Sequence, residues 1–243
     1  MKRVPVRPAR FAGVFVAASL TIGFSSGTAE APVIPGGPER PERAAPRVAL
    51  QAGHWLASEA PDELRRLRSN GANWNGLHES EVTLRIAELA AERLRAAGVE
   101  VEVLPTTVPP SYQADLFISI HADGNNSSDA NGFSVAASRR DRTGRGSAFV
   151  EILAQTYREA TGLRHHTNVT RRMVSYYAFN SRRYDHAIHD TTPGVIIETG
   201  FLTSPKDRAI IVDAPERSAE GIAAAVLRYL EIPPAPPATI VAR

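Results

Sequence analysis

The 243-residue sequence predicts a single α/β domain with a mainly parallel, twisted sheet and helices on both faces. Short apolar runs alternate along the chain with segments whose apolar residues recur at helical spacing, which is typical of a sheet built from strand–helix units. Two of the runs, 115–122 and 194–199, have mainly apolar residues on both faces, as expected of parallel strands buried on both sides. The length suffices for one domain with a substantial core and makes a second large domain unexpected.

The first half of the domain contains two predicted strands around one predicted helix. Residues 48–53 (VALQAG) form a short apolar strand that ends before a histidine, and residues 99–104 (VEVEVL) alternate as a strand does. Residues 80–97 are predicted to be helical, with Gly98 as the stop. The apolar positions of this helix fall on one face, at Val82, Ile86, Leu89, Ala90, Leu94 and Ala97.

The second half repeats the alternation. Residues 115–122 (DLFISIHA) read as a buried strand, 132–138 as a further strand, and 194–199 (GVIIET) as another buried strand. Helices are predicted at 146–160, which a glycine follows, and at 215–230. The carboxyl ends of parallel strands share one edge of the sheet, where open α/β sheets form their sites.

The two ends of the chain differ in composition from the domain. Residues 1–29 combine a basic start with an apolar stretch of signal-peptide length, and we expect cleavage after Ala29 and export of the domain; an uncleaved N-terminal anchor is the alternative. Residues 30–46 hold five prolines and are expected to be a linker. The catalytic domain is then expected at 47–232, with a Pro-rich tail at 233–243.

Charge and cysteine content exclude several classes of function. The formal charge of +2 becomes −2 when residues 1–29 are removed, so the sequence gives no case for nucleic-acid binding through a basic face. Once the signal segment is cleaved, no membrane attachment is expected. The absence of cysteine excludes disulfides and thiolate metal sites.

Four residues stand where the predicted strands end or where the first long helix begins: His54, Glu79, His121 and Glu198. Two imidazoles and one carboxylate are a common ligand set for catalytic zinc, and a second carboxylate beside the bound water can serve as a general base. Glu198 is the best candidate for that base, because a carboxylate at the rim of an apolar strand is costly unless it is paired, protonated or close to a metal. A buried ion pair with an arginine is the alternative.

From the residues alone, more than one side chain near residue 79 could be the third ligand. Acidic residues are common at helix N-termini for electrostatic reasons, which weakens the argument for Glu79. Glu81 is its rival and His78 a weaker one, although periodicity puts Glu81 on the outer face of the helix. Asp123 could contact a ligand imidazole from behind.

At these residues the chain resembles the zinc-dependent N-acetylmuramoyl-L-alanine amidases, a family that cleaves peptidoglycan. The resemblance is carried, in order, by Gly53-His54, by E-S-E-V-T-L-R-I-A at 79–87, by S-I-H-A at 119–122 and by E-T-G-F-L at 198–202. It favours Glu79 over Glu81. It implies His54, Glu79 and His121 as ligands of Zn²⁺ and Glu198 as the catalytic carboxylate.

The resemblance implies hydrolysis of the amide bond between N-acetylmuramic acid and L-alanine, with peptidoglycan as the partner. Together with the N-terminal segment, we expect an exported protein, in the periplasm or in the extracellular space and cell wall. Two alternatives remain. One is a zinc carboxypeptidase-like peptidase, with the arginine pairs 171–172 or 182–183 holding the substrate carboxylate; the other is an inactive wall-binding protein. The sequence identifies no activator protein.

Two segments depart from the family pattern or lack a role. Residues 56–77 form a long insert with a predicted short helix at 62–71, and the insert is expected to shape or cover the cleft. Residues 164–192 are rich in His, Arg and Tyr and poor in core residues, which favours an active-site loop. Within it, His186 and His189 are candidates for contact with substrate or a developing oxyanion, and surface residues without a role are the alternative.

Overall fold

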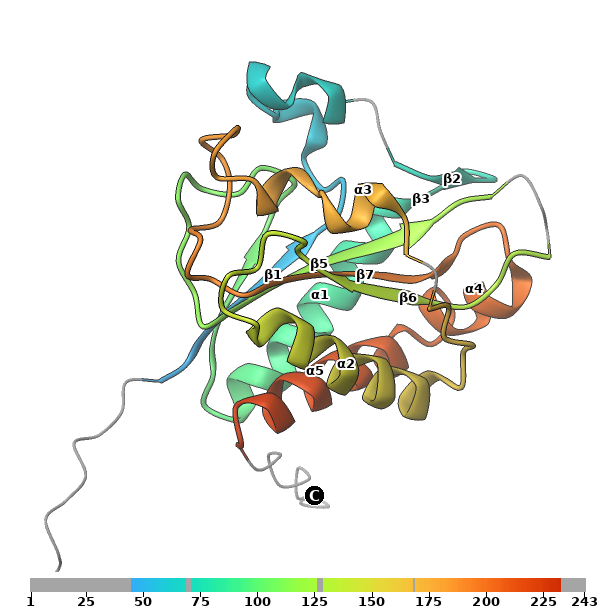
Figure 1. Cartoon of the computed structure of the whole chain (residues 1–243). Helices are drawn as coiled ribbons and strands as arrows, with labels where there is room; N and C mark the ends of the chain where they lie inside the picture. The colour runs from blue at the N-terminus through green and yellow to red at the C-terminus, as the bar shows by residue number, and fades with distance from the viewer. Residues whose placement is uncertain (1–44, 69–70, 126–128, 168, 233–243) are drawn as a thin grey trace, which may run out of the picture. The chain divides into compact units, whose positions relative to one another are not determined.

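A five-stranded sheet, in which four strands run parallel and one edge strand runs antiparallel, forms the centre of the computed structural model (Figure 1). The structure describes residues 45–68, 71–125, 129–167 and 169–232. The expected signal segment, nearly all of the linker and the tail lie outside them. No helix in these ranges has both the length and the apolar character that a membrane span requires.

The order of the strands across the sheet is β4-β1-β5-β7-β6, and β2 and β3 form a separate two-stranded hairpin. The strands are β1 (Arg47–Ala52), β2 (Asn73–Trp74), β3 (Leu77–His78), β4 (Glu100–Leu104), β5 (Leu116–Asp123), β6 (Ser134–Ala137) and β7 (Gly194–Phe201). Because β1, β5 and β7 are parallel neighbours, their carboxyl ends meet at one edge of the sheet.

The helices differ greatly in length. The α-helices are α1 (Glu79–Ala96), α2 (Arg145–Thr161), α3 (Arg171–Val174), α4 (Pro205–Ile211) and α5 (Pro215–Tyr229), and the 3₁₀ turns are η1 (Ala57–Glu59), η2 (Asp62–Leu67) and η3 (Tyr177–Phe179). The short helix expected at 62–71 is therefore a 3₁₀ segment over 62–67, a form that short helical pieces often take.

The two faces of the sheet are covered by different kinds of structure. The three long helices α1, α2 and α5 pack on one face, the lower one in Figure 1, where Leu116, Ile118 and Ile120 of β5 join the larger core cluster. The opposite face carries α3, the 3₁₀ turns and their loops, and Phe117 joins a smaller cluster there. The predicted fold class is confirmed, with the long helices all on one side.

The segment 164–192 differs from its prediction. Met173, Tyr177, Ala178 and Phe179 are buried and belong to the smaller core cluster, so this stretch is not poor in core residues. Its aromatic side chains cover the sheet face that the long helices leave open. The segment therefore has a packing role, which its many polar neighbours in the sequence concealed.

Candidate metal centre

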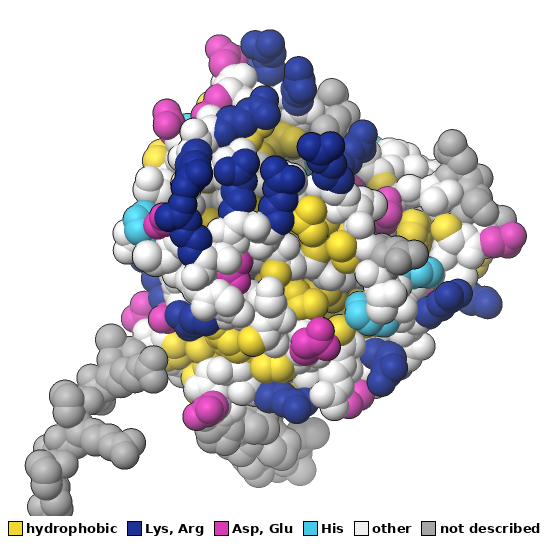
Figure 2. Space-filling model, viewed as in Figure 1, with side chains coloured by type: hydrophobic (Ala, Val, Ile, Leu, Met, Phe, Trp, Pro, Cys, Tyr) yellow, Lys and Arg dark blue, Asp and Glu magenta, His cyan; other side chains and the backbone are white. Residues whose placement is uncertain are grey.

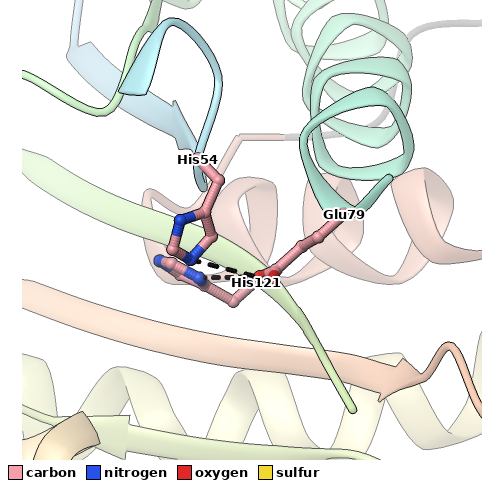
Figure 3. A group of neighbouring side chains, drawn as sticks. All are labelled: His54, Glu79 and His121. Carbon is pink, nitrogen blue, oxygen red and sulfur yellow. Dashed lines mark hydrogen bonds and ion pairs between the residues drawn. The ribbon is translucent and has the colours of Figure 1, made fainter. Parts of the chain in front are cut away.

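His54, Glu79 and His121 come from three distant parts of the chain and converge at the carboxyl edge of the sheet (Figure 3). His54 follows β1 after one glycine, Glu79 is the first residue of α1, and His121 lies near the end of β5. One ligand atom from each residue can be chosen so that all lie within 4.8 Å of one another. Within the residues that the structure describes, these three side chains form the group of His, Cys, Asp or Glu residues that could hold a metal ion.

Gly53 allows the first strand to approach His121 closely. A Cβ atom at this position would lie 2.7 Å from Nδ1 and Cε1 of His121 and 2.7 Å from the carbonyl oxygen of Ile120. The Gly53 N–H donates to that same carbonyl (2.8 Å), and Thr83 of α1 donates its hydroxyl to the Gly53 carbonyl (2.7 Å). The glycine is thus required for close packing, whereas the left-handed backbone conformation that turns the chain is at His54, with φ of 62°.

Glu79 is held by hydrogen bonds to both carboxylate oxygens. Oε1 lies 2.9 Å from His121 Nδ1 and accepts from the Ala122 N–H (3.0 Å), while Oε2 accepts from the Ala72 N–H (2.7 Å). Oε2 also lies 3.7 Å from His54 Nε2, and the rings of His54 and His121 meet edge to face with centroids 5.0 Å apart. The Glu79 side chain is therefore fixed in position by its surroundings.

The buried pair of Glu79 and His121 has an electrostatic environment that favours charge. Burial alone would raise the pKa of Glu79, but the hydrogen bond from His121, the charges of both imidazoles and the Ala72 N–H lower this pKa overall. Burial alone would lower the pKa of His121, but the Glu79 carboxylate outweighs it and the pKa is raised. In the absence of metal, Glu79 and His121 thus each favour the charged form of the other.

Glu198 lies opposite His121 on the neighbouring strand, since their Cα atoms are register partners of β5 and β7. Side chains at paired positions of adjacent strands point to the same face, so Glu198 is beside the three-residue group. Burial is the main cause that raises the pKa of Glu198 to about 8; His121 lowers it, and the charges of Glu79 and Asp123 raise it further. Such a carboxyl group can hold a proton near neutral pH.

The rival ligands lie apart from this group. Glu81 is exposed on α1, and His78 is exposed and pairs with the Asn73 side chain (2.9 Å). The Asp123 carboxylate accepts a hydrogen bond from the Gly124 N–H (2.7 Å), and its negative charge raises the pKa of His121.

The two candidate histidines of the 164–192 segment are outside the group as well. His186 Nδ1 lies 2.6 Å from Glu63 in η2, which connects the segment to the insert at 56–77. His189 pairs with the Thr191 hydroxyl (2.8 Å) and lines a separate cavity near Gly194, at the start of β7. Neither position supports a role at the metal centre.

Tyr176 is a residue at the centre that the sequence did not single out. Its hydroxyl lies 3.4 Å from His121 Nε2, and the two rings meet edge to face with centroids 5.3 Å apart. Glu79 and Tyr176 thus contact opposite nitrogens of one imidazole, which fixes the ring orientation. The available signal was the aromatic pair 176–177 inside an otherwise polar stretch.

The fold and this group define an α/β protein with a candidate metal centre of two imidazoles and one carboxylate, and a further carboxyl group beside it. Comparison with known proteins identifies the family. The family model described as N-acetylmuramoyl-L-alanine amidase matches residues 48–228, and the chain belongs to this family. The expected resemblance is thereby confirmed.

Individual relatives agree with the family match. The chain is 28% identical over 176 residues to the N-acetylmuramoyl-L-alanine amidase LytC of Bacillus subtilis (strain 168), over 67% of this chain and 33% of LytC. The matched part thus spans about a third of that relative. Among solved structures, AmiC2 of Nostoc punctiforme has a TM-score of 0.54 at 23% identity, covering 76% of this chain and 97% of AmiC2. Ami1 of Mycobacterium smegmatis has a TM-score of 0.57 at 19% identity, and the match covers 77% of this chain and 98% of Ami1. At these identities the structures support the fold alone.

Proposed function

We propose that the protein is an exported zinc-dependent amidase that hydrolyses the amide bond between N-acetylmuramic acid and L-alanine in peptidoglycan. One observation carries the proposal: the convergence of His54, Glu79 and His121 at the sheet edge, with Glu198 in register beside them. Membership of the amidase family supplies the substrate class. Export is supported by the composition of residues 1–29 and by the location of peptidoglycan.

The donor set fits zinc. Ligand atoms at about 2.0–2.2 Å from a tetrahedral Zn²⁺ are separated from each other by about 3.4 Å. In this structure the separation is 2.9 Å between His121 Nδ1 and Glu79 Oε1 and 3.7 Å between His54 Nε2 and Glu79 Oε2, on either side of that value. Nitrogen and oxygen donors without thiolates suit zinc, and three protein ligands leave a coordination position open, as catalytic sites require.

The residues of the chain have distinct roles in the proposed reaction. A bound zinc ion would supply an activated water and polarise the scissile carbonyl. Glu198 accepts a proton from the attacking water as the new C–O bond forms. The same carboxyl group then donates that proton to the alanine nitrogen as the C–N bond breaks, which leaves a lactyl carboxylate and a free amine. Tyr176, which contacts the Nε2 atom of His121, keeps that ring in place during these steps.

The two alternative functions have less support. A carboxypeptidase needs a cationic group within about one residue of the metal, whereas Arg182 lines a cavity at Gly194, four residues from Glu198 along β7. A wall-binding protein without activity would have no need of Glu198 at the rim of an apolar strand. Product analysis separates all three functions.

The test is digestion of purified sacculi by the purified protein, with and without a chelator, followed by labelling of new amino termini. The proposal expects zinc in the protein, new N-terminal alanine, and loss of both metal and activity with the chelator. Release of a C-terminal amino acid would favour the carboxypeptidase, and sacculus binding without cleavage would favour the wall-binding protein.

A matched pair of variants tests the role of Glu198. Glu198→Gln is expected to keep zinc and to lose activity by a factor of about 10² or more. Glu81→Gln, which changes an exposed glutamate on α1, should keep both. Wild-type turnover in Glu198→Gln would remove Glu198 from the mechanism.

A further inference from the structure

The Arg–Arg doublets of the sequence all lie on one side of the protein. There are four of them, at 65–66, 139–140, 171–172 and 182–183. They belong to η2, to the loop after β6, to α3 and to the loop after η3, which cover the sheet face that the long helices leave open. We call this surface, formed by residues 57–68, 138–142 and 169–192, the basic face. In Figure 2 the dark-blue side chains of Lys and Arg gather over it.

Hydrogen bonds join the three segments of the basic face into one continuous surface. The Glu63 carboxylate of η2 accepts from the N–H groups of Asp185 (3.1 Å) and His186 (3.0 Å). The Arg139 N–H donates to the Val174 carbonyl (3.1 Å), which connects the 138–142 loop to α3. Buried side chains of the smaller core cluster support the segments from below. The arginines are therefore carried by a packed scaffold.

Charge is divided unevenly between this face and the rest of the domain. The basic face has ten arginines and six acidic residues, a formal charge of +4 with histidine neutral. The other residues of 45–232 comprise eleven basic and seventeen acidic ones, a formal charge of −6. The small net charge of the domain thus conceals one strongly basic surface. Such a surface attracts polyanions.

The acidic residues of the basic face leave most of its arginines uncompensated. Asp62 pairs with Arg68 (2.8 Å), and Asp190 lies 3.8 Å from an Arg142 nitrogen. The Asp141 carboxylate accepts hydrogen bonds within its own loop and from α2. All eight arginines of the doublets are exposed, and no ion pair holds any of them within the part of the chain that the structure describes.

Part of the basic face is hollowed. A cavity of about 440 Å³ lies at the amino end of β7, with Gly194 among its lining residues. Arg139 and Arg140 line it from one loop, and Arg182 lines it from another. Guanidinium groups that come from different loops suit an anion whose oxygen atoms point in several directions, as those of phosphate do, whereas a carboxylate has two oxygen atoms in one plane. The hollow therefore favours a phosphate group.

The metal centre lies at the edge of the same sheet face. His121 and Phe117 are four residues apart on β5 and point to the same side, and Phe117 belongs to the core cluster beneath the basic face. Tyr176, within the segment 169–192, contacts His121. A ligand on the basic face is thus held on the side of the protein where the reaction is proposed.

We propose that the basic face binds a linear polymer of the cell envelope with repeated phosphodiester groups, one in the hollow and others on the doublets outside it. The doublets at 65–66 and 171–172 do not line the hollow, so a single phosphate cannot use them all. A bilayer presents its phosphates in one plane and does not enter a hollow, which favours a flexible chain. The inference rests on the proposed function for the exported location, but binding requires neither metal nor turnover.

The test measures binding of the purified protein to fluorescently labelled poly(glycerol phosphate) by anisotropy. The comparison ligands are poly-L-glutamate of equal charge and vesicles of phosphatidylcholine with phosphatidylglycerol. The variant is Arg139→Gln/Arg140→Gln/Arg171→Gln/Arg172→Gln. The control is Arg85→Gln/Arg158→Gln/Arg217→Gln/Arg228→Gln, which removes equal charge from exposed positions of α1, α2 and α5. Circular dichroism checks folding, and Arg171→Gln/Arg172→Gln alone replaces the variant if the latter does not fold.

The wild type is expected to bind poly(glycerol phosphate) more tightly than poly-L-glutamate, and more tightly than vesicles at equal phosphate concentration. Binding should weaken as salt screens the exposed arginines. Because each exposed charge contact contributes a factor of roughly 1.5 to 5, the fourfold variant should lose affinity by about fivefold or more and the double variant by about twofold or more. The control should stay close to the wild type.

Three results would overturn the inference: an equal loss of affinity in the control, equal or tighter binding of poly-L-glutamate, and tighter binding of the vesicles, which would assign the face to lipid headgroups. Chelator-treated protein should bind the polymer as the untreated protein does. The sacculus assay on the same preparations therefore reports separately on the proposed function.

Discussion

Adding one methyl group at Gly53 should disturb the metal centre without touching a ligand. The new Cβ would lie 2.7 Å from two atoms of the His121 ring, and ordinary contact begins at 3.4 Å, so the atoms must separate by about 0.7 Å. The Ile120 carbonyl, also at 2.7 Å, accepts a hydrogen bond from the Gly53 N–H and cannot retreat without weakening it. The His121 ring is therefore the group that moves.

The cost of Gly53→Ala follows from this geometry. Overpacking of a filled site destabilises a protein by about 1–3 kcal/mol. Disturbing a group that orients a ligand typically lowers metal affinity 10- to 100-fold. We therefore expect zinc affinity, measured by competition with a chromogenic chelator, to fall by at least about tenfold in a protein that still folds.

A control separates lost stability from lost geometry. Gly98→Ala, after the end of α1, destabilises the fold by a different cause, because it places an alanine at φ of 83°, and nothing lies within 4 Å of its Cβ. It should lose roughly 1 kcal/mol and keep wild-type zinc affinity. If Gly53→Ala bound zinc as tightly as Gly98→Ala does, the packing argument at His121 would be refuted.

Three further predictions concern charge. In the metal-free protein the raised pKa of Glu198, about 8, favours its protonated form in the folded state, so unfolding free energy should fall as pH rises from about 4.5 to 8. Urea denaturation at both ends of this pH range, with chelator present, should show a smaller fall in unfolding free energy for Glu198→Gln than for the wild type. An equal fall in both proteins would contradict this. The raised pKa of His121 predicts that zinc binding releases protons, visible as a dependence of the calorimetric heat on buffer ionisation enthalpy, and identical heats in all buffers would count against it. The pKa of Glu63 is lowered by its hydrogen bonds to His186 and Asp185, against the opposing effect of burial. Glu63 should therefore stabilise the fold above its unfolded-state pKa and lose this effect as pH falls. Glu63→Gln should lower the free energy of unfolding at pH 7 by about 1 kcal/mol or less, and a larger loss would refute a surface role.

The parts of the fold that the sequence predicted are those with strong periodicity or continuous burial. The predicted helix at 80–97 differs from α1 by one residue at each end, because its apolar positions face the sheet in every turn. The strand 132–138 was expected in a mainly parallel sheet, but its direction could not be predicted, and β6 pairs antiparallel with β7. Direction depends on the path of the preceding loop, which local pattern does not encode.

Other elements were missed for identifiable reasons. α4 is only seven residues long, although Ser204 caps it by accepting from the Asp207 N–H (3.3 Å) and Pro205 begins it. The β2–β3 hairpin has two-residue strands that are mostly exposed, too short for alternation to be seen. Tyr176 was missed because its role depends on a contact with a histidine 55 residues away, and single-sequence reasoning has no access to such contacts.

The charges around His121 give an independent reason to expect a cation at this edge of the sheet. The negative charges of Glu79, Glu198 and Asp123 all raise the pKa of this imidazole, so each favours its protonated form. Without a metal, the cluster balances itself only in part, through a proton on His121 and a carboxyl pKa raised to about 8 at Glu198. A divalent ion in place of the His121 proton would add positive charge where three acidic groups converge, and would lower the pKa of Glu198 toward the range of a working base. The same residues that make the metal-free site costly thus become complementary once a cation is bound.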